Sequence, residues 1–296
     1  MTFARSVTLG IAASALVAAG FGTSRVVCAQ QTGSRDAGRT TARPIDAGRP
    51  DGSRDAATDT GADADARASM PIRTHCPDGM RLVDGEYCPT VEQECLRWLD
   101  PDEEIPMRCA EFAPTRCVSR RTRHVNVCMD EYEYPNRAGA YPQVMVSWYA
   151  ARRACEARGA RLCTMSEWTF ACEGEQMLPY PYGQQRDDTA CHFDHQRLRP
   201  DRARLANPAT SADESARLYD AVPSGQYSRC VSPFGIHDMT GNADEWTLNE
   251  TGQPYQSGLK GGWWGPIRAR CRPATVSHNE GFVYYQIGFR CCADPT

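Results

Sequence analysis

Residues 234–246 read FGIHDMTGNADEW and combine two glycines and one asparagine with three carboxylates and a closing tryptophan. Glycine and asparagine adopt turn conformations that most other residues avoid. The Ser-Pro-Phe-Gly sequence at 232–235 is itself a turn signal. The segment therefore predicts a tight loop in which backbone carbonyls converge beside carboxylates.

Two helices are predicted before this loop. The first spans Ser147 to Arg158, with Ser147 as its cap and Gly159 as the left-handed residue that ends it. The second starts at Thr164, whose side chain forms a capping box with Glu167, and ends at Gly174.

Beyond Gly174 we expect only loops and strands. Turn signals occur at Tyr180-Pro-Tyr-Gly and Pro223-Ser-Gly, and Phe282 to Cys292 is the clearest late strand. The predicted structure is thus poor in helices.

The first 29 residues have the parts of a secretory signal: Arg5 near the start, an apolar run from Val7 to about Phe21, and small residues up to Ala29. The apolar run is shorter than the ~20 residues that a membrane-spanning helix needs. We therefore expect cleavage after Ala29 and export to the periplasm or the extracellular space. The alternative is a lipoprotein anchored at Cys28, although the residues before this cysteine match a lipidation signal poorly.

Residues 30–72 are rich in Gly, Ala, Asp, Arg, Thr and Pro and contain no aromatic residue. Such a segment cannot bury enough apolar surface to offset the entropy of ordering, so it predicts a disordered linker. The remaining residues, 73–296, suit one domain. We divide it into a cysteine-rich N-terminal part at 73–128 and a core at 129–296.

The net charge is −4, and basic and acidic residues are interspersed rather than grouped. This distribution gives no electrostatic footprint for nucleic acid, so that class of partner is excluded. We expect a monomer without a transmembrane helix.

The sequence contains 15 cysteines and no Cys-x-x-Cys pair, which favours disulfides over zinc binding. Removal of Cys28 with the signal leaves an even number. Six cysteines, at positions 76, 88, 95, 109, 117 and 128, precede the core and allow fifteen connectivities. The shortest candidate is Cys76–Cys88, and the other pairings stay open.

The order of the core segments resembles that of the formylglycine-generating enzymes, or sulfatase-modifying factors. The matching segments are Val144-Met-Val-Ser-Trp148, Ala154-Cys155, Arg161-Leu-Cys-Thr-Met-Ser-Glu-Trp168, Ala171-Cys-Glu-Gly174, Tyr180-Pro-Tyr-Gly183, residues 234–246, Lys260-Gly-Gly262 and Ile287-Gly-Phe-Arg-Cys291. Residues 129–133, Met-Asp-Glu-Tyr-Glu, stand where the family has an Asp-x-x-Glu strand. The resemblance covers roughly residues 78–293 and implies an irregular, disulfide-rich α+β fold related to C-type lectins.

The resemblance implies two disulfides, Cys155–Cys291 and Cys172–Cys271. Each closes a long loop, for which a chain-entropy model gives about 4 kcal/mol of stabilisation. Two further pairs are our own assignment: Cys191–Cys230, which brackets the intervening loop, and Cys163–Cys292.

The resemblance also implies a calcium site in the loop at 234–246, with Asp238, Gly241, Ala243 and Glu245 as ligands. Calcium prefers several hard oxygens in a flexible arrangement, which carboxylates and carbonyls of a glycine-containing turn supply. The alternative is that both carboxylates only cap turns. A second family site corresponds to His192 and Phe193, where histidine is a poor calcium ligand.

The family's catalytic cysteine pair, which binds copper and oxidises a substrate cysteine, has no counterpart here. After Lys260-Gly-Gly262 the segment is shortened and reads WWGPIRARC, in which Cys271 matches the structural cysteine. Asp244 replaces a residue that is usually aromatic in the family. A copper–thiolate site needs the missing sulfurs, so we expect neither copper nor formylglycine formation.

Several polar and aromatic groups remain near this segment: Trp263, Arg268, Arg270, Arg272, His278 and Glu280. Arginines beside aromatic faces suit carboxylate, sulfate or sugar ligands. His278 with Glu280 suits acid–base chemistry or a metal. The alternative is that the tryptophans fill the core, the arginines lie on a solvated face and His278 is simply hydrogen-bonded.

Two functions are compatible with these residues. The first is an exported, calcium-stabilised binding or structural module without catalysis, for a protein, glycan or small-molecule ligand. The second is a divergent metal-dependent oxidase or oxygenase with new ligands near His278 and Glu280, for which iron stays open. The missing thiols favour the first.

Overall fold

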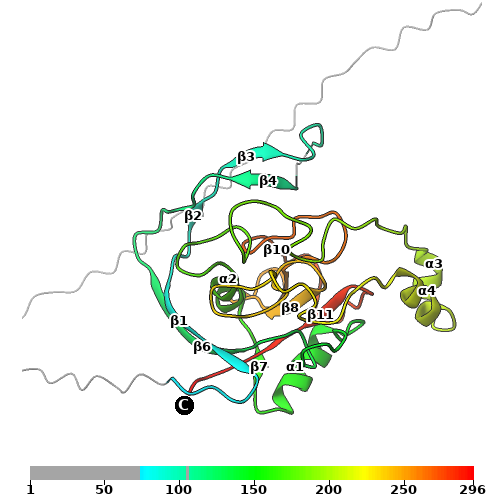
Figure 1. The fold of residues 1–296 in the computed structure, drawn as a ribbon. Coiled ribbons are helices and arrows are strands. Elements are labelled where there is room, and N and C mark those ends of the chain that lie inside the picture. Colours follow the sequence, from blue (N-terminus) through cyan, green and yellow to red (C-terminus); the bar gives the residue numbers. More distant parts are fainter. Residues whose placement is uncertain (1–73, 105–106) are drawn as a thin grey trace, which may run out of the picture. The chain divides into compact units, whose positions relative to one another are not determined.

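The structure is a computed structural model that describes residues 74–104 and 107–296. The predicted signal at 1–29 and the predicted linker at 30–72 lie outside the described residues. Figure 1 shows the path of the chain through the strands and helices of the described part.

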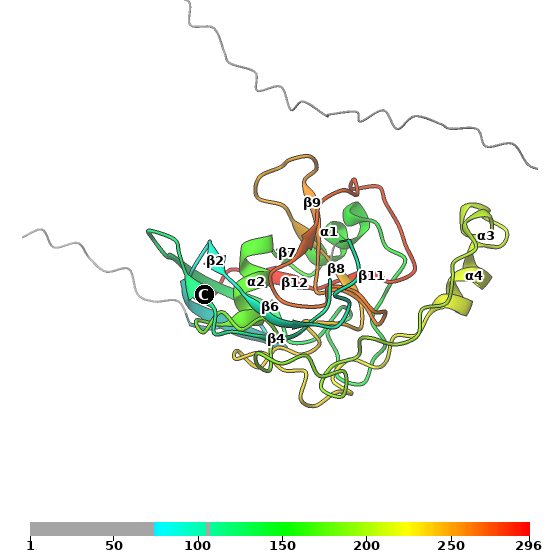
Figure 2. The ribbon, with the colours of Figure 1, turned by 90° about the horizontal axis from the view of Figure 1, so that it is seen from above.

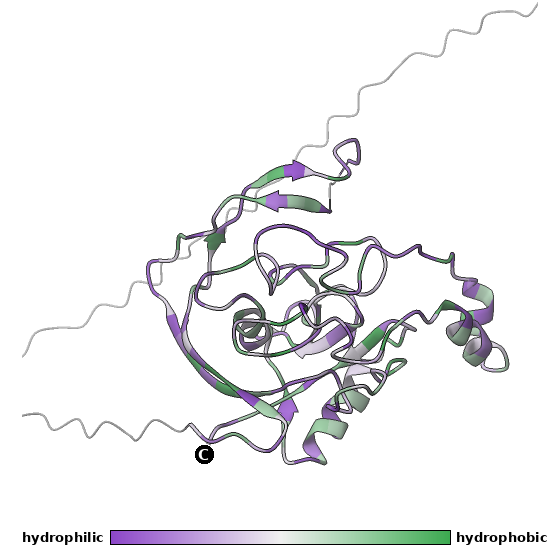
Figure 3. Ribbon diagram, viewed as in Figure 1, coloured by the Kyte–Doolittle hydropathy of each residue, from purple (hydrophilic) through white to green (hydrophobic). Residues whose placement is uncertain are grey.

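One four-stranded antiparallel sheet has the order β1-β6-β12-β7. Its strands are β1 (Met80–Tyr87), β6 (Arg123–Asp130), β12 (Cys291–Ala293) and β7 (Arg161–Leu162). Hydrophobic and hydrophilic residues mix along β1 and β6 (Figure 3). In β1 buried and exposed positions intersperse, whereas β6 is buried throughout from Val127 to Asp130.

A second four-stranded sheet has the order β10-β9-β8-β11. It consists of β10 (Ala274–Thr275), β9 (Ser257–Lys260), β8 (Asp244–Leu248) and β11 (Ile287–Phe289). The pairing of β8 with β11 is parallel. Because Arg290 alone separates β11 from β12, it lies at the junction of the two sheets.

Both predicted helices are confirmed within two residues. Helix α1 spans Trp148–Glu156, and Ser147 Oγ accepts a hydrogen bond from the Ala150 amide at 3.3 Å. Helix α2 spans Met165–Glu173 with the predicted capping box, and Gly174 follows it at φ 63°.

The two helices cover different parts of the core (Figures 1 and 2). Helix α1 buries Trp148, Ala151 and Cys155 against residues of β8, β9 and β11. Helix α2 packs against β1 and β6 with the aromatic rings of Trp168 and Phe170. Burial of these apolar side chains is the main source of stability here.

The expectation of only loops and strands beyond Gly174 is wrong. Helices α3 (Arg202–Ala206) and α4 (Ser211–Leu218) pack against each other at one edge of the domain (Figure 2). The Asp201 carboxylate caps α3 by accepting hydrogen bonds from the Ala203 and Arg204 amides at 3.0 and 3.1 Å.

The late strand is also shorter than predicted. Regular strand structure is confined to β11 and β12, while Phe282 and Tyr284 pack against the core from a loop. The aromatic residues of this segment therefore indicated packing against the core but not pairing in a sheet.

The cysteine-rich part forms two small two-stranded sheets in addition to β1 and β6. They pair β2 (Val91–Glu92) with β5 (Arg116–Cys117), and β3 (Cys95–Trp98) with β4 (Cys109–Phe112).

Seven disulfides join the fourteen cysteines of the described residues. The pairs Cys155–Cys291, Cys172–Cys271, Cys191–Cys230 and Cys163–Cys292 are all formed. The expected Cys76–Cys88 pair is wrong, because the extended strand β1 holds these two cysteines apart. The pairs at this end are Cys76–Cys128, Cys88–Cys117 and Cys95–Cys109.

Among the described residues, no helix combines the length and apolar character needed to cross a membrane.

Candidate functional site

A cluster of charged side chains is buried where the two sheets meet. We call Glu133, Asp238, Glu245 and Arg290 the buried charge centre; each is at most 2% exposed. Arg290 donates two 2.7 Å hydrogen bonds to Glu245, one to each carboxylate oxygen. Trp168 Nε1 donates a further 2.7 Å hydrogen bond to Glu245. Such bidentate pairing offsets the cost of burying both charges.

Within residues 74–104 and 107–296, no cation forms such a pair with Glu133 or Asp238. Glu133 accepts hydrogen bonds from Ser224 Oγ at 2.9 Å, Asn242 Nδ2 at 2.7 Å and the Ala243 amide at 3.2 Å. Burial, followed by the nearby charge of Asp238, raises the pKa of Glu133 well above its usual value. Burial likewise raises the pKa of Asp238 to about 6.

The loop predicted to bind calcium contributes Asp238 and Glu245 to the buried charge centre. The two carboxylates differ in their hydrogen-bond partners and therefore in how well each could bind calcium. Both Glu245 oxygens are occupied by Arg290 and Trp168, so Glu245 fits a calcium ion poorly. Asp238 fits better, since among the described residues its carboxylate accepts a single hydrogen bond, from the Gly225 amide at 2.6 Å. Oxygen donors from Asp238 and Glu133 are of the kind that calcium prefers.

Gly241 gives this loop its tight turn. Its φ is 83°, and a Cβ at this position would lie 2.4 Å from the carbonyl oxygen of His192. The same carbonyl accepts a 2.9 Å hydrogen bond from the Asn242 amide. The predicted second calcium site is consequently a poor fit, because the His192 carbonyl is engaged and Phe193 is buried under the Arg186 guanidinium.

Tryptophans occupy the segment in which the family has its catalytic thiols. Trp263 and Trp264 are at most 5% exposed and pack with Tyr285 in one hydrophobic cluster. The Gly262 amide donates a 3.0 Å hydrogen bond to Asp244, which anchors the start of the segment. Cys271 is bonded to Cys172, so it is not a free thiol.

The three candidate arginines Arg268, Arg270 and Arg272 contact different parts of the molecule. Arg268 donates a hydrogen bond to Thr275 Oγ1. Arg270 lies over the Phe112 ring at 5.1 Å, and its Nε is buried without a hydrogen-bond partner.

Arg272 has a structural role between the core and the cysteine-rich part. Its guanidinium pairs with both oxygens of Glu173 and donates to the carbonyls of Cys88 and Pro89 at 2.8 and 3.1 Å. The candidates Arg268, Arg270 and Arg272 therefore have separate partners.

Two adjoining cavities share Arg202 and Tyr284, and together we call them the arginine groove. The first, of about 520 Å³, has a mostly apolar lining that includes Leu259, Phe282 and Ile287. The second, of about 730 Å³, is lined by Arg197, Arg199, Pro200, Asp201, Arg202 and Tyr284. The groove therefore combines an apolar part with a basic one.

His278 lines the apolar part of the arginine groove and stacks on Phe282 at 4.0 Å. Glu280 instead accepts a 2.6 Å hydrogen bond from the Gln256 amide and does not line the groove. The structure therefore does not bring His278 and Glu280 together as an acid–base pair.

The groove arginines were missed in the sequence. Arg197, Arg199 and Arg202 are exposed, whereas the Asp201 carboxylate beside them is used to cap α3. The Arg197 guanidinium lies 5.7 Å from the centre of the Trp263 ring. The available signal was the basic run RLRPDR at 197–202, just before the unpredicted α3.

Residues 85–295 match the family model described as "Sulfatase-modifying factor enzyme 1-like domain". The chain belongs to this family. Its irregular, disulfide-rich α+β fold is the one that membership leads us to expect. The disulfides also fit an exported protein, as predicted.

Curated relatives of this sulfatase-modifying-factor-like domain include a protein named as a formylglycine-generating enzyme and one named as inactive. The "Inactive C-alpha-formylglycine-generating enzyme 2" of Bos taurus is 28% identical over 167 residues, 52% of this chain and 50% of that protein. The "Formylglycine-generating enzyme" of Bos taurus is 27% identical over 174 residues, 52% of this chain and 44% of that protein. The chain thus spans about half the length of these relatives or less.

Among solved structures, that of CarF is 13% identical and covers 73% of this chain and 97% of its own, with a TM-score of 0.48.

Proposed function

We propose that this sulfatase-modifying-factor-like domain is a non-catalytic module that binds a ligand outside the cytoplasm. The carrying observation is that all fourteen cysteines of residues 74–104 and 107–296 are in disulfides. None of them is available as a thiolate for copper or for a thiol-dependent oxidation. The bovine relative that is named inactive supports the same proposal.

The arginine groove is the proposed binding site. Guanidinium groups form paired hydrogen bonds with carboxylates and sulfates, and aromatic walls suit a sugar ring or another apolar group. The ligand that fits this groove carries a sulfate or carboxylate next to such a ring. Stacking of Arg197 over Trp263 limits the motion of one basic group before the ligand binds.

Calcium is proposed as a stabiliser of the module, remote from the ligand. The buried charge centre holds three carboxylates and one guanidinium, an excess of two negative charges. Burying unpaired charge is costly unless protons or a cation neutralise it. Asp238 and Glu133, with the Gly241 and Ala243 carbonyls of the predicted set, are the proposed donors.

The alternative of a metal-dependent oxidase has less support. His278 stacks on an aromatic ring and Glu280 is directed to another loop, so the two do not form the shared ligand set that this function requires. Incubation with copper, oxygen and a cysteine-containing peptide tests it directly. Mass spectrometry should show an unchanged peptide cysteine, and its oxidation would refute the non-catalytic proposal.

Binding is tested with the full chain and two immobilised polysaccharides, heparin for sulfate and polygalacturonate for carboxylate, with neutral dextran as the blank. We expect at least one of the charged polysaccharides to retain the chain at physiological salt. An R197A/R199A/R202A variant should bind it at least tenfold more weakly.

The matched control is R120A/R121A/R137A, which removes the same charge from exposed arginines elsewhere. Retained binding by this control separates recognition by the groove from general electrostatic attraction. Equal losses of binding in both variants, or no retention of the chain by either charged polysaccharide, would refute the proposed ligand class.

A further inference from the structure

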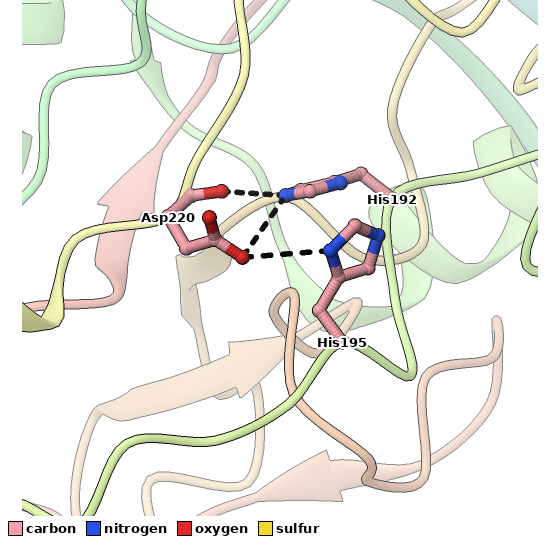
Figure 4. Close-up of side chains that lie close together, drawn as sticks. All are labelled: His192, His195 and Asp220. Carbon is pink, nitrogen blue, oxygen red and sulfur yellow. Dashed lines mark hydrogen bonds and ion pairs between the residues drawn. The ribbon is translucent and has the colours of Figure 1, made fainter.

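Two histidines and an aspartate converge (Figure 4) next to the disulfide Cys191–Cys230, and none of the three belongs to the buried charge centre. His192 and His195 come from the loop after Cys191, and Asp220 follows helix α4. In Figure 4 the Asp220 carboxylate faces both imidazoles.

The backbone around the two histidines is firmly held. Asp194, which lies between them, has a φ of 64° and accepts two hydrogen bonds from the buried Arg186 guanidinium at 2.6 and 2.9 Å. The His195 amide donates to the Trp264 carbonyl at 2.8 Å. The loop thus presents both rings on one side with little freedom to move apart.

The distances between the possible ligand atoms of the three side chains are close to those between the ligands of a metal ion. Asp220 Oδ2 lies 3.5 Å from His195 Nδ1 and 4.0 Å from His192 Nε2. One nitrogen or oxygen of each residue lies within 4.8 Å of those of the other two. Zinc bonds of about 2.0–2.1 Å place neighbouring tetrahedral ligands roughly 3.4 Å apart. Small side-chain rotations would therefore complete the site.

We propose that His192, His195 and Asp220 bind a zinc ion. Two imidazoles and one carboxylate form a donor set that zinc accepts, and three protein ligands leave a fourth position open to water or another ligand. A calcium ion would not favour this set, because two of its three donors are nitrogens.

Tyr227 orients the buried ring. Its hydroxyl lies 3.3 Å from His192 Nδ1, so an Nδ1–H donated to this oxygen leaves Nε2 as the metal-binding atom. Nε2 lies on the side of Asp220, whose backbone oxygen is 2.5 Å away. Without a metal, Nε2–H donates a hydrogen bond to this carbonyl oxygen, so zinc binding at Nε2 replaces that proton.

The site is open to solvent on one side. His195 and Asp220 are 38% and 55% exposed at their side chains, whereas His192 is buried. His195, Asp220 and Trp264 line a cavity of about 340 Å³ through which an ion can enter. This cavity is separate from the arginine groove, since the two have no lining residue in common.

The test uses the untagged full chain, stripped with a chelator and titrated with zinc chloride alone. We expect uptake of one zinc ion per chain, with binding weakened at least tenfold in H195A and in D220N. Both side chains are partly exposed, so these variants should fold, which circular dichroism would verify. Cobalt as a substitute should give the visible absorption of a four-coordinate site, lost in the same variants.

Two further variants sharpen the result. Y227F should weaken zinc binding by about tenfold through loss of the orienting hydrogen bond, while leaving the ion-to-protein ratio unchanged. H278A is the control, because it removes a histidine from the arginine groove. The proposal is overturned if no stoichiometric uptake occurs, if H195A and D220N bind zinc as the unaltered chain does, or if H278A alone removes binding.

Discussion

The buried charge centre and the arginine groove use the same kinds of side chain for opposite purposes. In the buried charge centre, Arg290 is 1% exposed and both oxygens of its partner Glu245 are taken. In the arginine groove, Arg199 and Arg202 are exposed at the wall of a cavity. Only the second arrangement leaves donors available for a ligand.

The difference shows that burial and pairing, rather than residue type, separate structural from binding arginines in this fold. Arg272 illustrates the point: it lies in the segment where a ligand site was expected, yet Glu173 and two carbonyls use its donors. A buried pair stabilises the fold but cannot be broken without exposing a charge to an apolar interior.

Loss of Arg290 should give the largest effect on the free energy of unfolding. R290M leaves Glu245 buried without its guanidinium, and removal of one partner from a buried pair costs about 3–5 kcal/mol. Chemical denaturation monitored by tryptophan fluorescence measures this difference.

The double variant R290M/E245Q tests the reason for that loss. It removes the orphaned charge while keeping an acceptor for Trp168, so it should recover part of the stability. If the double variant is less stable than R290M, the uncompensated charge is not the cause.

Calcium should have the next largest effect. A ligand that binds only the folded state at 100 times its dissociation constant adds about 2.7 kcal/mol. We expect the melting temperature to rise on adding calcium chloride to chelator-treated protein. The E133Q variant should lose this response. Without calcium it should be more stable than the unaltered chain at a pH at which Glu133 is ionised, because one buried negative charge is then gone.

D213N is the matched control for the calcium prediction, since Asp213 is exposed on α4. It should respond to calcium as the unaltered chain does. A melting temperature that is indifferent to calcium in the unaltered chain would contradict the proposal.

The sequence predicted those parts of the fold whose signals are local. The cap at Ser147 and the box of Thr164 with Glu167 lie within four residues of the groups they bind, so helix boundaries followed from them. The cysteine-rich part was different, because six cysteines allow many pairings. Contacts distant in sequence bring Cys76 near Cys128: His75 exchanges backbone hydrogen bonds with Thr296, and Ala293 of the same C-terminal segment pairs with Cys128.

The candidate site was predictable only in part for a related reason. Asp238 and Glu245 were expected to share a centre, but their partners Glu133 and Arg290 come from distant segments of the chain. No local pattern tells that Arg270 turns inward while Arg199 faces the arginine groove. That choice depends on packing across the whole domain.

The buried residue Lys260 allows a pH-dependent test of how buried charged groups affect stability in this fold. It is the only lysine of the sequence, is 1% exposed and donates to the Arg272 carbonyl at 2.8 Å. Burial lowers the pKa of Lys260 to about 7, partly opposed by Glu173.

Between pH 7 and 10.5 the unfolded chain holds more protons at Lys260 than the folded one, so this residue makes stability rise with pH. The K260M variant should lack this contribution. Its stability relative to the unaltered chain should therefore fall by about 2 kcal/mol from pH 6.5 to pH 9. Parallel curves for the two proteins would show that the buried lysine stays charged throughout.

The arginine groove should show the smallest effects on stability. Exposed substitutions usually change the free energy of unfolding by no more than about 0.5 kcal/mol, which is the expectation for R199A and R202A. R197A should cost slightly more, about 0.5–1 kcal/mol, because its guanidinium lies over the Trp263 ring. The denaturation midpoints of R197A, R199A and R202A show which of these variants loses the most stability.

A loss above about 2 kcal/mol in R199A or R202A would mean that these arginines also support the fold. The contrast between the two regions would then fail, and weaker polysaccharide binding by the triple variant could reflect partial unfolding. Small losses together with lost binding would instead show that the groove arginines are spared for the ligand. Stability and binding measured on the same variants therefore decide whether the exposed basic run at 197–202 is a binding surface or only a second structural element.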